Sequence, residues 1–250
     1  MSRKSRAGST STLRQLKGWK KLQYILDYYK FPLLLAAAAL YIIIWLTMRN
    51  LTQKDVVLYV GLVNAAPSEE LILKLSDGYL EETGFPKSDN SVYLYRNLFL
   101  SADETSEYHP YSYATKMKIL GAIDANQLDV VLMNQEAFDA FSQNGYLADL
   151  QELLNSPEAG ADGRSLFKAV KGSLCTNVRI EEDNSVDVLL GNETEYHSVT
   201  TKGSFGLNLT DASALVGNAG LSGTVFLGII KNSTRKKEAV QYLDYLIRYH

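Results

Sequence analysis

The chain has 250 residues, of which 46% are hydrophobic and 21% are charged, with 5 Pro and 17 Gly. This is the composition of a folded protein, and it excludes the fibrous, low-complexity and intrinsically disordered classes. Cys175 is the only cysteine, which excludes an internal disulfide and a cysteine-rich metal site.

Charge is distributed unevenly along the chain, whose formal net charge is -3. Residues 1–30 contain eight Lys or Arg and one Asp, so this segment carries +7 and the remainder carries -10. An acidic body is repelled by phosphate backbones. We therefore expect no nucleic-acid partner.

An apolar run without any charged residue, FPLLLAAAALYIIIWLTM, extends from Phe31 to Met48 between Lys30 and Arg49. As a helix it would be about 27 Å long, close to the thickness of the hydrocarbon core of a bilayer. The sequence predicts a single-pass transmembrane helix over residues 31–49. Because the basic excess lies on the amino-terminal side, we expect residues 1–30 in the cytoplasm and the carboxyl-terminal domain outside the cell membrane.

Two alternatives exist for this segment. A cleaved signal peptide needs a short basic region and a small-residue cleavage site, whereas here the basic region is long and Thr47, Met48 and Arg49 follow the apolar run. A buried core helix rarely has so basic a leader. Both alternatives are therefore less favoured than an uncleaved anchor.

After a short linker (50–54), an α/β pattern begins. Residues 55–63 (DVVLYVGLV) form an apolar run typical of a strand buried on both faces of a parallel sheet. A helix follows, which Pro67 and Ser68 open and Gly84 and Pro86 end. Its expected apolar stripe consists of Leu71, Ile72, Leu75, Tyr79 and Leu80.

The pattern then repeats. We expect a strand near 91–99, a loop over 100–110, a helix over 111–124 and a strand over 128–133. A further helix over 135–144 should place Phe138 and Phe141 inward. Alternating strands and helices predict right-handed crossovers and a mainly parallel sheet. The inward residues expected for the helix over 111–124 are Ala114, Met117, Leu120 and Ile123.

Beyond residue 150 the pattern is weaker. Residues 186–190 and 225–230 resemble strands, and residues 234–249 have the periodicity of an amphipathic helix. The segments 155–163 and 191–223 are rich in Gly, Ser, Asn and Thr and receive no assignment.

Two stretches resemble a known family. LDVVLMNQEAFDAFSQNGYLADLQELL (128–154) and FLGIIKNSTRKKEAVQYLDYL (226–246) are similar to segments of the extracellular solute-binding proteins of bacterial ABC importers. The anchored arrangement is similar to uncharacterised membrane-bound relatives in Gram-positive bacteria. The resemblance implies a periplasmic-binding-like α/β domain over 55–250, a small polar solute and an ABC-type permease or another membrane protein as partner.

The chain also departs from this family. Members have two full lobes, whereas about 200 residues leave room for one lobe and a second lobe reduced to about 160–223. Two lobes around a cleft would favour solute capture. A single lobe with exposed loops would favour a protein partner.

Candidate binding residues follow the strands, because ligands of open α/β sheets bind outside the carboxyl ends of the strands. The loops concerned are 64–68, 101–113 and 134–136, and the middle one is rich in tyrosine, whose ring and hydroxyl suit sugars, peptides or proteins. The asparagines are equally suited to turns and caps, and the tyrosines to covering the sheet. The candidates are Asn64, Ser68, Tyr108, Tyr111, Tyr113, Asn134 and Glu136.

No catalytic, metal or cofactor motif occurs in the sequence. His109, His197 and His250 are isolated, and neither a nucleophile elbow nor a phosphate-binding loop is present. We therefore expect a non-enzymatic binding protein without a cofactor or metal. We interpret the chain first as a membrane-anchored receptor for a small polar solute. The alternative is an extracellular protein-interaction or scaffold module of a membrane complex.

Overall fold

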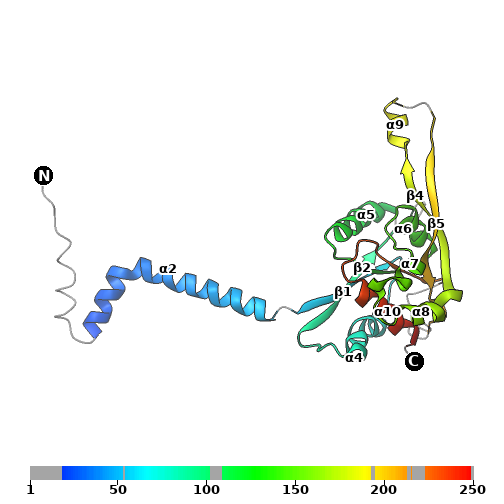
Figure 1. The fold of residues 1–250 in the computed structure, drawn as a ribbon. Coiled ribbons are helices and arrows are strands. Elements are labelled where there is room, and N and C mark those ends of the chain that lie inside the picture. Colours follow the sequence, from blue (N-terminus) through cyan, green and yellow to red (C-terminus); the bar gives the residue numbers. More distant parts are fainter. Residues whose placement is uncertain are drawn as a thin grey trace. The chain divides into compact units, whose positions relative to one another are not determined.

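The computed structural model describes residues 19–52, 54–101, 109–192, 195–212, 215 and 223–248. The chain divides into two units, Met1–Gln53 and Lys54–His250, which are considered separately. Figure 1 labels their helices and strands.

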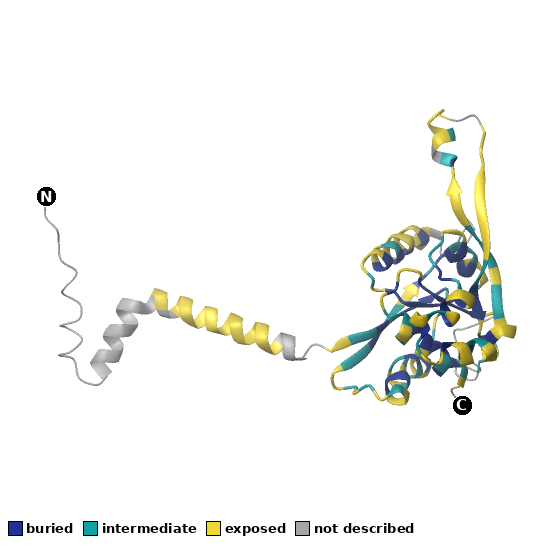
Figure 2. Cartoon of the chain, viewed as in Figure 1, coloured by how far each residue is buried: buried dark blue, intermediate teal, exposed yellow. Residues whose placement is uncertain are grey.

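The first unit contains helix α2 (Trp19–Thr52). Its described side chains from Phe31 to Met48 are exposed, among them Phe31, Ile43 and Trp45 (Figure 2). The side chains of residues 19–30, 33 and 49–52 of this helix are not described. Among the residues whose side chains are described, no helix is both long and apolar enough to cross a membrane. Residues 1–18 of the predicted cytoplasmic segment lie outside the described residues.

The second unit is built on one six-stranded sheet with the order β2-β1-β3-β6-β5-β4. Strand β1 pairs in parallel with both β2 and β3, while β6 is antiparallel to β3, and β5 and β4 continue antiparallel. The predicted parallel arrangement of the first three strands is thus confirmed, and the sheet as a whole is mixed. The strands are β1 (Asp55–Val63), β2 (Asn90–Leu98), β3 (Val130–Met133), β4 (Leu174–Asp183), β5 (Ser198–Asn208) and β6 (Phe226–Ile229).

Helices connect and cover these strands. The predicted helix after β1 is confirmed as α3 (Glu69–Leu73), the π-helical η1 (Lys74–Gly78) and α4 (Tyr79–Thr83), and it ends at Gly84 in the left-handed conformation with φ of 76°. The other helices are α5 (His109–Asp124), α6 (Gln135–Gln143), α7 (Leu150–Asn155), η2 (Pro157–Ala159), α8 (Gly163–Val170), η3 (Lys171–Ser173), α9 (Ser185–Leu189) and α10 (Lys236–Arg248).

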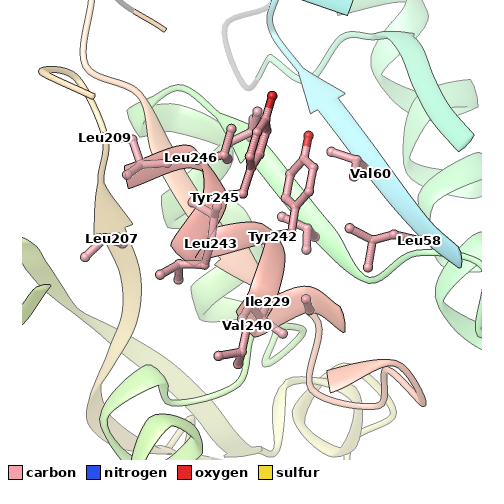
Figure 3. Packing of buried hydrophobic residues seen from close by; sticks show 14 of the residues in the cluster. Leu58, Val60, Leu207, Leu209, Ile229, Val240, Tyr242, Leu243, Tyr245 and Leu246 are labelled. Carbon is pink, nitrogen blue, oxygen red and sulfur yellow. The ribbon is translucent and has the colours of Figure 1, made fainter. Parts of the chain in front are cut away.

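The larger core lies where α10 packs on one face of the sheet (Figure 3). Tyr242 and Leu243 of α10 are fully buried together with Leu58 and Val60 of β1. The Tyr242 hydroxyl donates to the Leu75 carbonyl over 2.9 Å, so this buried polar group is satisfied. The closing helix predicted over 234–249 is therefore confirmed as a core element.

Helices α5 and α6 contribute to a second core. Phe138 and Phe141 are buried there as predicted. The predicted inward face of α5 is confirmed in part: Ile123 is buried and Leu120 is half-buried, but Met117 is 53% exposed and Ala114 is also exposed. The helix also buries Ser112, Thr115, Ile119 and Ala122, which were not predicted.

Two hydroxyl groups explain the orientation of α5. The Ser101 amide donates to Ser112 Oγ over 2.8 Å, and the Phe99 amide donates to Thr115 Oγ1 over 3.2 Å. These hydroxyls accept hydrogen bonds from backbone groups just after β2 and so draw Ser112 and Thr115 inward. A pattern of apolar residues alone does not predict these two buried positions.

The second correction concerns residues 186–190, which were expected to form a strand. Residues 186–189 belong to the short helix α9, which lies between the long strands β4 and β5, and Leu190 follows it in a turn. Within the described part of residues 160–223, β4 and β5 join the same sheet as β1 and form no separate one. The strands of the described residues therefore form a single sheet.

A buried carboxylate joins strand β1 to the segment before α10. Asp129, which is 0% exposed, accepts hydrogen bonds from Ser233 Oγ at 2.6 Å and from the Tyr59 amide at 2.9 Å. Arg235 Nη1 lies 3.6 Å from the same carboxylate. Burial raises the pKa of Asp129, although these bonds and Arg235 oppose the shift.

Candidate functional site

Two of the predicted site residues form a brace at the carboxyl ends of β1 and β3. Asn64 Nδ2 donates to Asn134 Oδ1 over 3.1 Å and to the Leu100 carbonyl over 2.7 Å. The Leu100 amide returns a bond of 2.8 Å to Asn64 Oδ1. The brace therefore links the segments that follow β1, β2 and β3. Both polar side-chain atoms of Asn64 are engaged in hydrogen bonds within the protein.

Local conformation explains why asparagine occupies these positions. Asn64 has φ of 54°, in the left-handed region that asparagine tolerates better than most residues. Asn134 caps α6, because its Oδ1 also accepts from the Ala137 amide over 3.0 Å. The turn-and-cap alternative for these two residues thus has direct geometric support.

Ser68 and Glu136 occupy the first turns of two helices. Ser68 Oγ accepts from the Leu71 amide over 3.2 Å and caps α3. Glu136 is exposed in the first turn of α6, where its charge complements the helix dipole. Neither position lines a described cavity.

The two described tyrosines of the predicted site, Tyr111 and Tyr113, line none of the three cavities considered below. Tyr111 and Tyr113 lie on α5 and are 62% and 75% exposed. Tyr108 lies outside the described residues, as does the part of its loop from 102 to 108. The structure therefore brings Asn64 and Asn134 together and leaves the two described tyrosines on the surface.

Three cavities of the described residues lie elsewhere. One of about 530 Å³ lies between α4, η2 and α10 and includes Phe85, Leu166 and Tyr245. A second cavity, of about 520 Å³, is lined in part by Cys175, and a third of the same volume is lined in part by Arg179. None of the three contains a predicted site residue, and the described residues contain no cluster of side chains suited to hold a metal ion.

A feature that the sequence did not predict is the hairpin of β4 and β5. Its paired register runs from Leu174 opposite Leu207 to Asp183 opposite Ser198. The hairpin extends beyond the remainder of its unit and has α9 at its end (Figure 1). We call residues 180–200 the distal arm. Its described side chains are almost all exposed (Figure 2).

Packed contacts fix the base of the hairpin. The Arg179 guanidinium lies 4.5 Å from the centre of the Phe205 ring and donates from Nη2 to the Leu147 carbonyl over 2.8 Å. Asn177 Nδ2 donates to Asp139 Oδ1 of α6 over 2.8 Å. These bonds tie the last residues before the distal arm to the body of the domain.

The end of the distal arm is closed by Asn184, which is only 7% exposed. Its Nδ2 donates to the Glu195 carbonyl over 2.8 Å, and its Oδ1 accepts from the His197 amide over 2.7 Å. Next to it, Asp183 Oδ1 accepts from the Ser185 amide, which lowers the pKa of Asp183 because the bond favours the charged carboxylate. The tip is therefore an organised turn.

Large apolar side chains project from this organised tip. Leu189 is 85% exposed and Leu190 is 70% exposed. Tyr196 and Val199, on the returning segment, are 60% and 48% exposed. Exposed apolar groups gathered on one projecting element are typical of a surface for association.

No family model and no curated protein matches the chain. Among solved structures, the chain is similar to the substrate-binding domain of a molybdenum ABC transporter from Clostridium difficile, with 13% identity and a TM-score of 0.32. The alignment covers 78% of this chain and 93% of that domain. At this level the likeness supports no inference about ligand or partner.

Proposed function

We propose that this chain is a non-catalytic recognition module, anchored in a membrane by residues 31–49, that binds a protein partner through its distal arm. The partner belongs to the same membrane assembly, for which an ABC-type permease or another integral membrane protein is the candidate. The carboxyl-terminal unit faces the outside of the cell.

One observation carries this proposal: the described part of the distal arm has a hydrogen-bonded tip but belongs to neither hydrophobic core. None of its described residues belongs to either hydrophobic core, yet Asn184 holds its tip and Leu189 projects into solvent. Leaving such a leucine exposed forgoes about 1.5–3 kcal/mol that burial against a partner would recover. An organised element with this exposure fits binding better than a purely structural role.

The membrane anchor is supported by the apolar run and its flanks. Eighteen consecutive uncharged residues lie in helix α2, and its described side chains in this run are exposed. The basic residues lie before the run, which by the positive-inside rule orients the unit over Lys54–His250 outward. Extraction of native membranes with carbonate tests the anchor, which requires the chain to remain in the pellet.

Site-specific crosslinking in cells tests the function. A photo-crosslinking amino acid in place of Leu189 should give a crosslink to one protein, and the same substitution at Leu190 should give it too. Leu73 is a matched control, because it is an exposed leucine (57%) on α3, away from the arm. Crosslinking to the same protein with equal yield from Leu73 would reject the arm as the binding element.

Solute binding at the carboxyl ends of the strands is a second candidate, because Tyr111 and Tyr113 are exposed on the helix that follows β2. Exposed aromatic rings with hydroxyl groups suit a polar solute. Substituting Tyr111 with alanine should then abolish ligand-dependent stabilisation in a thermal-shift screen of small polar solutes. No stabilisation by any solute, or the same stabilisation in the variant, counts against this site.

A further inference from the structure

The distal arm is strongly acidic. Residues 180–200 contain no Lys or Arg, and their six carboxylates are Glu181, Glu182, Asp183, Asp187, Glu193 and Glu195. The five of these that the structure describes are all exposed. Among the described residues, no ion pair with Lys or Arg uses any of them.

The carboxylates lie close to the exposed apolar residues of the tip. Asp187 is two residues before Leu189 on α9, and Asp183 Oδ2 lies 3.5 Å from the Tyr196 hydroxyl. Asn192 Nδ2 lies 3.4 Å from Asp187 Oδ1, which holds this carboxylate beside the turn. The tip therefore presents exposed apolar side chains and carboxylates on the same element.

This combination disfavours two occupants. A membrane surface is disfavoured because anionic headgroups repel the carboxylates, and membrane-surface helices have basic residues on their polar face. A second copy of the arm is disfavoured because a symmetric contact would bring like charges together.

We infer that the distal arm docks onto a protein surface in which Lys or Arg side chains surround an apolar pocket. This inference rests on the proposed function and names the chemistry of its partner. Leu189 and Leu190 enter the pocket, while Glu181, Glu182 and Asp187 face the cations. The carboxylates accelerate encounter, and the leucines slow dissociation.

The test uses the full chain in bilayers of zwitterionic lipid and two photoreactive helical peptides of equal length. One peptide consists of leucine and lysine, and the other has glutamate in place of every lysine. We expect the lysine peptide to crosslink to residues 180–200 roughly tenfold more than the glutamate peptide, and 0.5 M salt to reduce this yield.

Matched variants distinguish binding by the distal arm from nonspecific attraction of the lysine peptide to the acidic domain. Leu189→Ser with Leu190→Ser, and separately Glu181→Gln with Glu182→Gln, should each lower the yield at the arm about tenfold. Glu69→Gln with Glu70→Gln removes an exposed acidic pair on α3 and should leave the yield within about twofold. Crosslinks spread evenly over the acidic body, or equal yields for the two peptides, would overturn the inference.

Failure of this inference is distinguishable from failure of the proposed function. If cellular crosslinks from Leu189 identify a partner but the lysine peptide shows no preference for the arm, the arm binds a protein of other chemistry. If Leu189 gives no specific cellular crosslink, the proposed function itself is wrong.

Discussion

Asn64 donates a hydrogen bond of 3.1 Å to Asn134, and this bond joins the residues that directly follow the neighbouring strands β1 and β3. In many open α/β sheets this edge is where ligands bind. Here the side chain of Asn64 instead bonds to Asn134 and to both backbone groups of Leu100. The edge is thus cross-braced, and its asparagines have a structural role.

Replacing Asn64 separates hydrogen bonding from backbone conformation. Asn64→Ala removes three hydrogen bonds and places alanine at φ of 54°, so we expect a loss of about 2–4 kcal/mol in the free energy of unfolding. Asn64→Gly should recover about 1 kcal/mol of this loss, because glycine adopts the left-handed conformation freely. Chemical denaturation of the two variants provides the comparison. Equal losses in the free energy of unfolding for the two variants would show that alanine adopts the left-handed conformation at residue 64 without a cost.

Asn184 should control the tip of the distal arm without controlling the fold. Asn184→Ala removes the bonds to Glu195 and His197, so we expect hydrogen exchange over residues 184–197 to accelerate about tenfold. The melting temperature should stay within about 2 °C, since local opening is independent of the core. Asn192→Ala is the control, because its one side-chain bond is long and exposed. A large drop in melting temperature would instead make the tip part of the core.

Two glycines predict effects of opposite sign. A Cβ atom at Gly206 of β5 would lie 2.5 Å from Cε2 of the buried Phe138, so Gly206→Ala should cost about 1–3 kcal/mol. At Gly121 in α5 nothing lies within 4 Å of such an atom, and Gly121→Ala should stabilise the protein by about 0.5–1 kcal/mol. Thermal unfolding measures both. A neutral Gly206→Ala would mean that β5 does not pass close to α6.

Asp129 predicts a pH dependence of stability. Burial raises its pKa above the ordinary value of 3.8, so the folded state holds this proton more tightly than the unfolded state does. Between the ordinary and the raised pKa, the folded state binds more protons, and the contribution of Asp129 to stability falls as the pH rises. The stability of the wild type relative to Asp129→Asn should therefore decrease as the pH rises from 3.8 through the raised pKa and then level off. An increase with pH would mean that Arg235 outweighs burial.

Elements with a one-sided or continuous apolar pattern could be predicted from the sequence. Strands β1 and β3 are apolar runs, and Phe138 and Phe141 lie one turn apart on α6, so burial alone specifies them. The face of α5 could not be predicted in this way, because Ser112 and Thr115 turn inward to satisfy backbone groups. That need depends on where β2 ends in three dimensions.

The distal arm was not predictable for a related reason. Strand β4 has no fully buried residue, and β5 is exposed over its first half, so neither shows the alternation that marks a strand. Their pairing joins Asp183 to Ser198 across α9 and is specified by backbone bonds and by Asn184. Asn64 and Asn134 could be singled out from their positions after two strands, but the sequence could not show that they bond to each other.

Removing the distal arm tests the central claim most directly. Residues 180–200 would be replaced by Asn-Gly, which closes the paired residues Arg179 and Thr201 with a two-residue hairpin turn. The protein that crosslinks to Leu189 in the full chain would then be followed by co-purification from membranes. We expect the partner to be lost while the melting temperature is retained within about 2 °C. Retention of the partner by the shortened chain would contradict binding through the arm.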